Sequence, residues 1–442
     1  MRAASHGATP NFAERLLSIQ RDEWPALALA FFYFFFLLCS YYILRPIRDE
    51  MGIAAGVSNM QWLFTGTFFA MILVMPLYGA VASRLPRRRL VPVVYYFFIA
   101  NIFVFYGLFA GGIDHAWVAR VFFVWVSVFN LFVVSVFWSL LVDLFTAEQA
   151  RRLFGVVAAG GSAGAIAGPT ITAAFAAQVG PVALLPVSAI LLLCAVGCVH
   201  GLVAHVRGRE AAGIHRPDPQ ANEPLGGSVL SGVGSVLRSP YLLGIAVFVF
   251  LYTLPGGLLY FSQASLIDGM ESDPGRRTQI LASIDLVVNI ATIGTQLFIT
   301  SFLARRFGLA FTLALIPVLG AIGIACFAIW PVLPVLVALQ VVRRAGEFAI
   351  TKPAREMLWS RVSDIDKYKA KNVVDTVVYR GGDVLSSWSF TLFTAAGLSL
   401  SAIALVGIPV ALVWAGVGIM LGRAYRASAG QQAPRRPAVE AP

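Results

Sequence analysis

The residues best suited to bind a polar solute are charged side chains in or beside apolar segments. The first group follows the uncharged run Trp24–Leu44 and comprises Arg45, Arg48, Asp49 and Glu50. Arg45 and Arg48 are three residues apart, so they share one face of a helix. A guanidinium is permanently charged and matches phosphate or carboxylate in a bidentate geometry. These residues either lie at the lipid headgroups, as charges near the end of a span usually do, or bind an anion.

A second group lies well inside the later stretch "LQVVRRAGEFAITKPARE", which carries Arg343, Arg344 and Glu347. Each charge at membrane depth costs roughly 2.5–3.5 kcal/mol on insertion scales, so the headgroup explanation does not apply to these three. Glu347 follows the two arginines by four and three residues, which is good geometry for an intrahelical ion pair. One carboxylate neutralises one guanidinium, and we therefore expect one spare positive charge here.

Other polar residues share these segments or their neighbours. The stretch "NVVDTVVYRGGDVLSSW" carries Asp375 and Arg380, and Lys371 precedes them at the entry to the same span. Asp285 and Asn289 are one turn apart on one face of an earlier segment, and Asn130 lies at mid-depth of another. A cavity lined from these segments would be net positive and would suit an anionic substrate.

The composition places the chain in a membrane. Of its 442 residues, 58% are hydrophobic and 12% are charged, against about 25% charged in soluble proteins. Apolar stretches long enough to span a bilayer recur throughout, which predicts transmembrane helices. The net charge of +11 reflects arginines and lysines in alternate loops, as the positive-inside rule requires, and does not indicate nucleic-acid binding.

No catalytic arrangement stands out in the sequence. The five histidines are scattered, no nucleophile–base pair or paired acid has catalytic spacing, and the four cysteines lie in apolar runs without acidic ligands nearby. We therefore expect no enzyme, no metal site and no cofactor.

The apolar stretches predict twelve helices, six on each side of a Gly- and Pro-rich polar linker. The predicted spans are 25–48, 60–85, 90–110, 117–145, 154–178, 182–206, 241–263, 278–303, 309–330, 331–358, 371–396 and 398–421. The corresponding regions are an N-terminal cytoplasmic segment 1–24, a six-helix half 25–206, a cytoplasmic linker 207–240, a six-helix half 241–421 and a disordered basic cytoplasmic tail 422–442. The basic loops place both termini in the cytoplasm.

An internal repeat supports two related halves. "YGAVASRLPRRRLV" and "ITSFLARRFGLAFTL" close corresponding helices about half the chain apart. Both resemble the loop motif of the major facilitator superfamily, G-x-x-x-D-R-x-G-R-R, although Ser83 and Arg305 occupy the place of its acidic residue. The span 154–178 is dense in glycine, and this spacing predicts close helix packing in preference to a phosphate loop.

Three further stretches resemble the nucleotide transporter (ATP/ADP translocase) family. They are "FFYFFFLLCSYYILRPIRDEMG", "FWSLLVDLFTAEQARRLFGVVAAGGSAGAIAG" and "DKYKAKNVVDTVVYRGGD". In the first, Leu44, Arg45, Arg48 and Asp49 fill the family's L-R-x-x-K-D pattern. The resemblance implies exchange of ATP for ADP, or nucleotide import with protons or phosphate, with Arg48 and Lys371 in the basic roles. Asn130 is the polar residue nearest to the place of the family's acid in helix four.

We therefore expect a major facilitator-type secondary transporter, a multi-pass protein of the plasma (inner) membrane, that moves an organic anion such as a nucleotide by alternating access. The predicted substrate-binding residues are Arg45, Arg48, Asn130, Arg343, Arg344, Lys371 and Arg380. The predicted charge-balancing or proton-coupling residues are Asp49, Asp285, Glu347 and Asp375. The expected partners are the lipid bilayer and a small anionic solute, and we expect a monomer that binds no nucleic acid.

Two other functions fit the same sequence. A proton-coupled carrier of a drug, peptide or lipid would use Asp285 and Glu347 as proton sites. A non-transporting membrane scaffold or sensor would need no substrate site, but the linker and the tail are too short to hold an extra folded domain.

Overall fold

The computed structural model describes residues 19–82, 86–113, 115–211, 229–363, 367 and 370–431. Parts of several predictions lie outside these residues: most of the N-terminal segment, the centre of the linker, the end of the tail, Ser83 and Lys369. Within the described part, the chain is helical and contains no strand.

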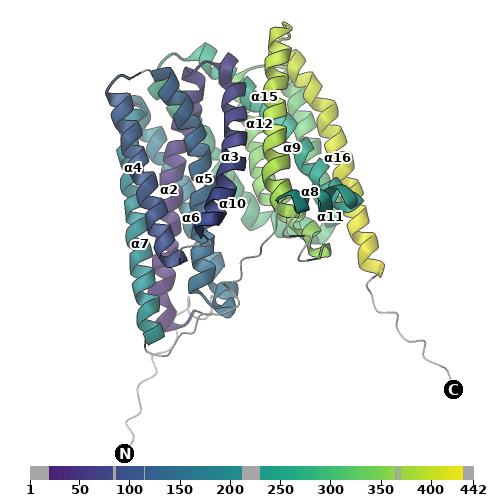
Figure 1. The fold of residues 1–442 in the computed structure, drawn as a ribbon. Coiled ribbons are helices and arrows are strands. Elements are labelled where there is room, and N and C mark those ends of the chain that lie inside the picture. The colour runs from purple at the N-terminus through teal and green to yellow at the C-terminus, as the bar shows by residue number, and fades with distance from the viewer. Residues whose placement is uncertain are drawn as a thin grey trace, which may run out of the picture. The chain divides into compact units, whose positions relative to one another are not determined.

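The long helices follow the apolar runs of the sequence (Figure 1). They are α2 (Trp24–Ala54), α3 (Met60–Ala82), α4 (Arg87–Ala110), α5 (His115–Leu144), α6 (Ala147–Val179), α7 (Leu185–Ala211), α9 (Pro240–Met270), α10 (Pro274–Phe298), α11 (Thr300–Ile329) and α16 (Leu400–Gln431). Ten helices of the described residues are long and apolar enough to cross a membrane. The prediction of an all-α polytopic membrane protein is confirmed.

The other two predicted spans are interrupted helices. The span 331–358 consists of α12 (Leu333–Gly346), the π-helical segment η5 (Glu347–Thr351) and α13 (Lys352–Leu358). The span 371–396 consists of the π-helical segment η7 (Val373–Val378) and α15 (Tyr379–Ala395). These are the two spans with most of the predicted charged residues, and π segments occur often at functional sites.

Several predicted boundaries differ from the structure. α2 continues to Ala54 through the charged residues that were expected to end it, and α16 continues to Gln431 into the predicted tail, where Ala and Arg are good helix formers. The linker contains a short helix, α8 (Val229–Arg238). The predicted loop after α10 is a turn inside α11 at Gly308, whose φ of 74° glycine adopts without strain.

The chain divides into two compact units. Unit 1 comprises Met1–Asp49 and Pro76–Pro224, and unit 2 comprises Glu50–Met75 and Leu225–Pro442. The predicted halves differ from these units mainly in residues 50–75, which belong to unit 2. In unit 1, α4 lies beside α7, and in unit 2, α11 lies beside α16 (Figure 1).

In unit 1, glycines allow α6 to lie directly against the backbone of α2. A Cβ atom on Gly160, Gly164 or Gly168 would collide with the carbonyl oxygen of Phe31, Phe35 or Cys39, respectively. Residues four apart share one helix face, so successive turns of α6 meet successive turns of α2. The predicted packing role of this glycine-rich helix is confirmed.

Ion pairs join the ends of the unit 1 helices that are predicted to be cytoplasmic. They are Arg87–Asp143 at 3.3 Å, Arg88–Glu210 at 2.6 Å, Arg152–Glu23 at 2.8 Å and Arg209–Asp22 at 2.6 Å. The carboxylates come from α5, α7 and the segment before α2, which explains how the ends are joined without an acidic residue in the loop motif.

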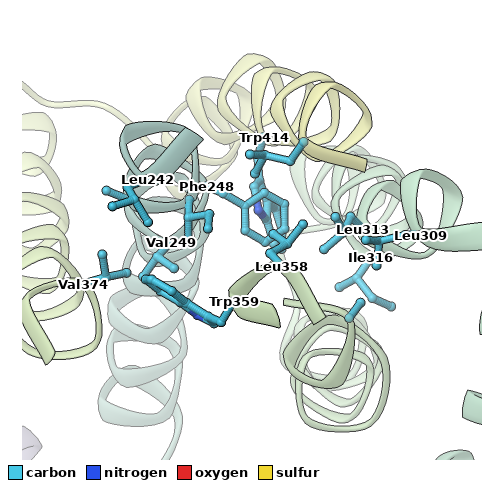
Figure 2. Packing of buried hydrophobic residues seen from close by; sticks show 14 of the residues in the cluster. Leu242, Phe248, Val249, Leu309, Leu313, Ile316, Leu358, Trp359, Val374 and Trp414 are labelled. Carbon is cyan, nitrogen blue, oxygen red and sulfur yellow. The ribbon is translucent and has the colours of Figure 1, made fainter. Parts of the chain in front are cut away.

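In unit 2, a hydrophobic cluster supports the interrupted spans (Figure 2). Phe248 of α9 and Trp414 of α16 pack with ring centroids 5.6 Å apart. Trp359, just after α13, and Val374, in η7, belong to the same fully buried cluster. The cluster therefore fixes the segments on either side of the charged residues.

Candidate functional site

The first charged group lies within a continuous buried helix. Asp49 and Glu50 are 7% and 1% exposed, so they do not reach the solvent in this structure. Arg48 donates from Nε and Nη2 to Oδ1 of Asp49, at 2.9 and 2.5 Å. The same guanidinium lies 5.0 Å from the centre of the Phe123 ring on α5. Arg48 is thus held within unit 1, and its charge is neutralised by its sequence neighbour.

The other predicted residues of unit 1 lie nearby on the same two helices. Arg45 has its guanidinium 5.8 Å from the centre of the Tyr42 ring, one turn earlier on α2. Asn130 is half-buried on α5, one turn after Ser127. Ser127 is the residue whose Oγ lies 3.5 Å from Nη1 of Arg48.

Glu50 was not among the predicted site residues, yet it is the most deeply buried acid of α2. Both of its carboxyl oxygens are buried and have no hydrogen-bond partner among the described residues. The charged groups acting on it from α10 and its N-cap are Arg277 and Asp273. Arg277 is itself bound to Asp268 at 2.7 Å. The sequence signal was present in the run "RDE", but Glu50 was grouped with charges expected at a helix end.

In unit 2, the predicted pairing of Glu347 with Arg343 or Arg344 is wrong. Arg344 instead forms an ion pair with Asp285 of α10, at 2.6 Å between Nη2 and Oδ1. No ion pair within 4 Å joins Glu347 to either arginine. The physical reason is that α12 ends at Gly346 and a π segment begins at Glu347. The spacing rule for i,i+4 pairs assumes α-helical geometry, which is lost there.

The π segment has a cause in the sequence. Pro353 has no N–H and its ring would clash with the carbonyl four residues earlier, that of Ala349. That carbonyl accepts a hydrogen bond from the Thr300 hydroxyl of α11 at 2.8 Å. The neighbouring carbonyl of Phe348 accepts from the Gln296 amide at 3.4 Å. The Thr300 hydroxyl therefore replaces the α-helical partner that proline removes from the Ala349 carbonyl, and the Gln296 amide binds the neighbouring carbonyl of Phe348.

Arg343 is buried, and the side chains that it contacts by hydrogen bonds and by its guanidinium face are neutral. Its side chain donates from Nε and Nη2 to Oε1 of Gln340, at 3.2 and 2.8 Å, and it lies 5.8 Å from the centre of the Tyr252 ring. Gln340 in turn donates to Gln263 of α9 at 3.2 Å. A Cβ atom on Gly256 would lie 2.9 Å from Nη1 of Arg343, so glycine is what allows the guanidinium to approach the α9 backbone.

Arg355 was missed as a site residue, because it lies near the predicted end of its span. The structure buries it at 7% exposure and pairs its Nη2 with Oδ1 of Asp375 at 3.2 Å. Asp375 lies in η7, so this pair ties α13 to the second π segment. Arg355 also acts electrostatically on Glu347, which lies in the first π segment. One arginine thus links the two interrupted spans.

The remaining predicted cations of unit 2 have acidic partners. Lys371 lies 2.5 Å from Oε2 of Glu356, and Arg380 lies 3.1 Å from Oδ2 of Asp383, three residues later. Of the charged residues in α12 and η5, Arg343 and Glu347 have no ion-pair partner among the described residues. The second carboxyl oxygen of Glu347 is buried and accepts no hydrogen bond. Arg343 and Glu347 are therefore the cation and the carboxylate of this group without an ion pair, their charges offset each other, and the spare positive charge expected from the sequence is not found.

The arrangement of buried charged and amide side chains can bind a polar solute. No cluster of three or more metal-ligating side chains occurs in the described part of the chain. The sequence profile of the Major Facilitator Superfamily matches residues 10–360. The chain belongs to this superfamily. It is accordingly an integral, multi-pass membrane transporter rather than an enzyme, which confirms the predicted fold and the broad prediction of transport.

Solved transporter structures share this fold. A bacterial homologue of the iron transporter ferroportin, in an inward-facing state, is 16% identical with a TM-score of 0.59, over 91% of this chain and 98% of that chain. The nucleoside transporter NupG is 16% identical with a TM-score of 0.57, over 92% and 99%. An auto-inhibited peptide transporter of the POT family is 13% identical with a TM-score of 0.61, over 94% and 99%.

These identities show the fold alone, since one fold hosts many substrates. No curated protein sequence matches the chain. The resemblance to the ATP/ADP translocase family is not confirmed by these comparisons, and nucleotide exchange stays a prediction.

Proposed function

We propose that this superfamily member is a secondary active transporter that moves a small organic anion by alternating access, with Arg343 as the principal anion-binding residue. The observation that carries the proposal is the burial of Arg343 at 8% exposure beside neutral partners, Gln340 and Tyr252. A buried charge is costly unless it is paired. A phosphate or carboxylate of the substrate would supply the missing counter-ion in the bidentate geometry that a guanidinium favours.

The neighbours of Arg343 support an anion that also carries a ring or amide. Tyr252 and Tyr379 lie with ring centroids 6.0 Å apart, tilted by 44°. Gln263 and Gln340 add amide groups that can donate to or accept from a neutral part of the solute. A nucleotide combines both features, and the resemblance of the helix-one and helix-eleven stretches to nucleotide transporters favours it within this class.

The other predicted site residues have supporting roles in this proposal. Arg344 with Asp285, and Arg380 with Asp383, are already neutralised and would shape the site. When the substrate is absent, Glu347 would offset the positive charge of Arg343 from a distance. When the substrate anion binds Arg343, Glu347 would take up a proton. Lys371 is paired with Glu356 and would contribute only where the substrate displaces that carboxylate. Arg45, Arg48 and Asn130 belong to unit 1, and their part in substrate binding stays a prediction.

The test is transport into proteoliposomes preloaded with unlabelled nucleotide, with labelled ATP, ADP and phosphate as separate probes. We expect Arg343→Gln to reduce uptake of the transported probe about 10-fold to 100-fold, as loss of a charged hydrogen bond of about 1.5–3 kcal/mol requires. Arg343→Lys should retain part of the activity. The exposed Arg276 of the same unit provides the matched control, Arg276→Gln.

Unchanged uptake by Arg343→Gln would remove Arg343 from the site. If folded wild-type protein moves none of the three probes, the nucleotide is discarded, and the same variants are compared with other labelled carboxylates and phosphates.

Proton coupling is a second candidate property, and the buried carboxyls of Glu50 and Glu347 favour it. Neither carboxyl has all its oxygens satisfied, and burial without a partner favours the neutral acid. We expect Glu50→Gln to keep exchange at equal pH but to lose any acceleration by an inward proton gradient. Asp49→Asn serves as the comparison on the same helix. A full gradient response in Glu50→Gln would exclude Glu50 as a coupling residue.

A further inference from the structure

Unit 2 contains a cavity of about 610 Å³ that the transport site does not use. It lies at the start of α9 and is lined by the end of α8, the segment after α13 and one residue of α16. Its polar lining residues are Ser235, Arg238, Ser239, Tyr241, Arg361 and Ser363. The volume falls within the range of about 300–1,000 Å³ that is typical of small-molecule sites.

The charged side chains that the described residues bring to this cavity are positive. They are two arginines, and the described part of the chain contributes no carboxylate to the lining. Arg361 lies over the Tyr425 ring on α16, 4.8 Å from its centre, and this contact helps to position its guanidinium. The Tyr241 hydroxyl donates to the carbonyl of Leu358 at 3.0 Å, which fixes this wall. The lining therefore suits an anion with several acceptor oxygens.

The α9 helix adds a second positive element. Ser239 is its N-cap, its hydroxyl accepts from the N–H of Leu242, and Pro240 opens a helix of 31 residues. Pro240 has no N–H and the N–H of Leu242 is already bonded to Ser239, so the start of α9 contributes chiefly its helix dipole, which favours an anion there. Leu242 both lines the cavity and belongs to the buried cluster of Figure 2, so the helix start is held by the core.

The short helix α8 indicates where this cavity lies relative to the membrane. Val236 is 4% exposed and packs in the buried cluster, whereas Leu237 is 66% exposed beside the exposed Arg238. A short helix with a buried face, an exposed Leu and a terminal Arg is typical of the membrane interface. The positive-inside prediction puts this end of the unit at the cytoplasmic leaflet, where anionic lipids are found.

We propose that this cavity binds the phosphate group of an anionic phospholipid, with Arg238 and Arg361 as the charged contacts and the helix dipole of α9 acting in the same direction. The lipid tails would run beside Leu237. This site is separate from the residues around Arg343 and does not depend on the identity of the transported solute.

The test measures the thermal unfolding midpoint of the purified full-length protein in detergent with added phosphatidylglycerol or phosphatidylcholine, or with inorganic phosphate at constant ionic strength. A ligand that binds the folded state raises the midpoint. We compare the wild type, Arg238→Gln, the double variant Arg238→Gln/Arg361→Gln, and Arg306→Gln. Arg306 is an exposed arginine of the same unit that also lies over a ring, that of Phe302, but does not line the cavity.

We expect phosphatidylglycerol to raise the midpoint of the wild type and of Arg306→Gln equally, and to raise that of the double variant by less than half as much. Arg238→Gln, whose side chain is exposed, should give an intermediate response, and it carries the test if the double variant folds poorly. An equal rise with phosphatidylcholine, or a full response in the arginine variants, would overturn the proposal. A full rise of the midpoint with inorganic phosphate alone would overturn the proposal of a lipid ligand, since the cavity would then bind free phosphate.

Discussion

Two regions, one in each unit, differ in how their helices are built: the α2–α6 contact of unit 1 and the interrupted spans of unit 2. In unit 1, α2 and α6 are continuous helices of 31 and 33 residues that meet along glycines. In unit 2, the spans with most of the charged residues are each interrupted by a π segment, at Glu347–Thr351 and Val373–Val378. The glycine contact is made by unbroken helices, whereas the polar cluster lies where the helices are interrupted.

The two regions also differ in whether charged side chains take part. The glycine contact of α6 with α2 at Gly160, Gly164 and Gly168 is made against backbone atoms and apolar or aromatic side chains, with no charged group. In unit 2, ion pairs cross between helices, and Arg343 is held by neutral groups only. We infer that the first contact stabilises its unit and that the second cluster binds the solute. The predictions below separate these two roles.

The largest effect is expected at the buried ion pair of unit 2. Arg344→Gln or Asp285→Asn leaves one charge buried without its partner, and each should lower the free energy of unfolding by about 3–5 kcal/mol. The double variant should lose less than either single variant, because no charge is left unpaired. Denaturant unfolding in detergent micelles measures all three. Additive losses in the double variant would show that the pair is not coupled.

A smaller loss is expected at the glycine contact of unit 1. A Cβ atom in Gly164→Ala would collide with the carbonyl oxygen of Phe35 and lie 3.0 Å from the backbone nitrogen of Cys39. Backbone atoms cannot move aside as side chains do, so we expect a loss of about 1–3 kcal/mol. Gly155 of the same helix has nothing within 4 Å. Gly155→Ala is the matched control, and it should be neutral or stabilising by up to about 1 kcal/mol. Equal stability of the two variants would refute the contact.

The smallest effect is expected at the Arg380–Asp383 pair. Its side chains are 28% and 17% exposed, more than those of Arg344 and Asp285. Asp383→Asn should therefore change the free energy of unfolding by less than about 1 kcal/mol. A loss as large as that at Asp285 would mean that partial exposure does not weaken ion pairs in this unit.

The fold could be predicted because its signals are local. Long apolar runs define ten of the helices among the described residues. The glycine-dense span 154–178 predicted close helix packing, which Gly160, Gly164 and Gly168 provide. The pair of Arg380 with Asp383 is of the kind that sequence spacing can reveal, because residues three apart lie on one helix face.

The site was predicted less well, because its partners come from other helices. Arg344 pairs with Asp285, and Asp375 pairs with Arg355, over separations that sequence spacing cannot reveal. The π segment at Glu347 changed which side chains could meet, and its cause, Pro353, was in plain view. Glu50 was overlooked because a run of charges was read as the end of a helix, although that helix continues to Ala54.

The central claim is that Arg343, and not the paired arginines, provides the positive charge for the substrate. The most direct measurement is equilibrium binding of the transported probe to purified Arg343→Gln and to the double variant Asp285→Asn/Arg344→Gln. Both variants remove one arginine, but the second removes a charge that is already neutralised. We predict that affinity falls about 10-fold to 100-fold in Arg343→Gln and less than about 3-fold in the double variant. Wild-type affinity in Arg343→Gln would contradict the account.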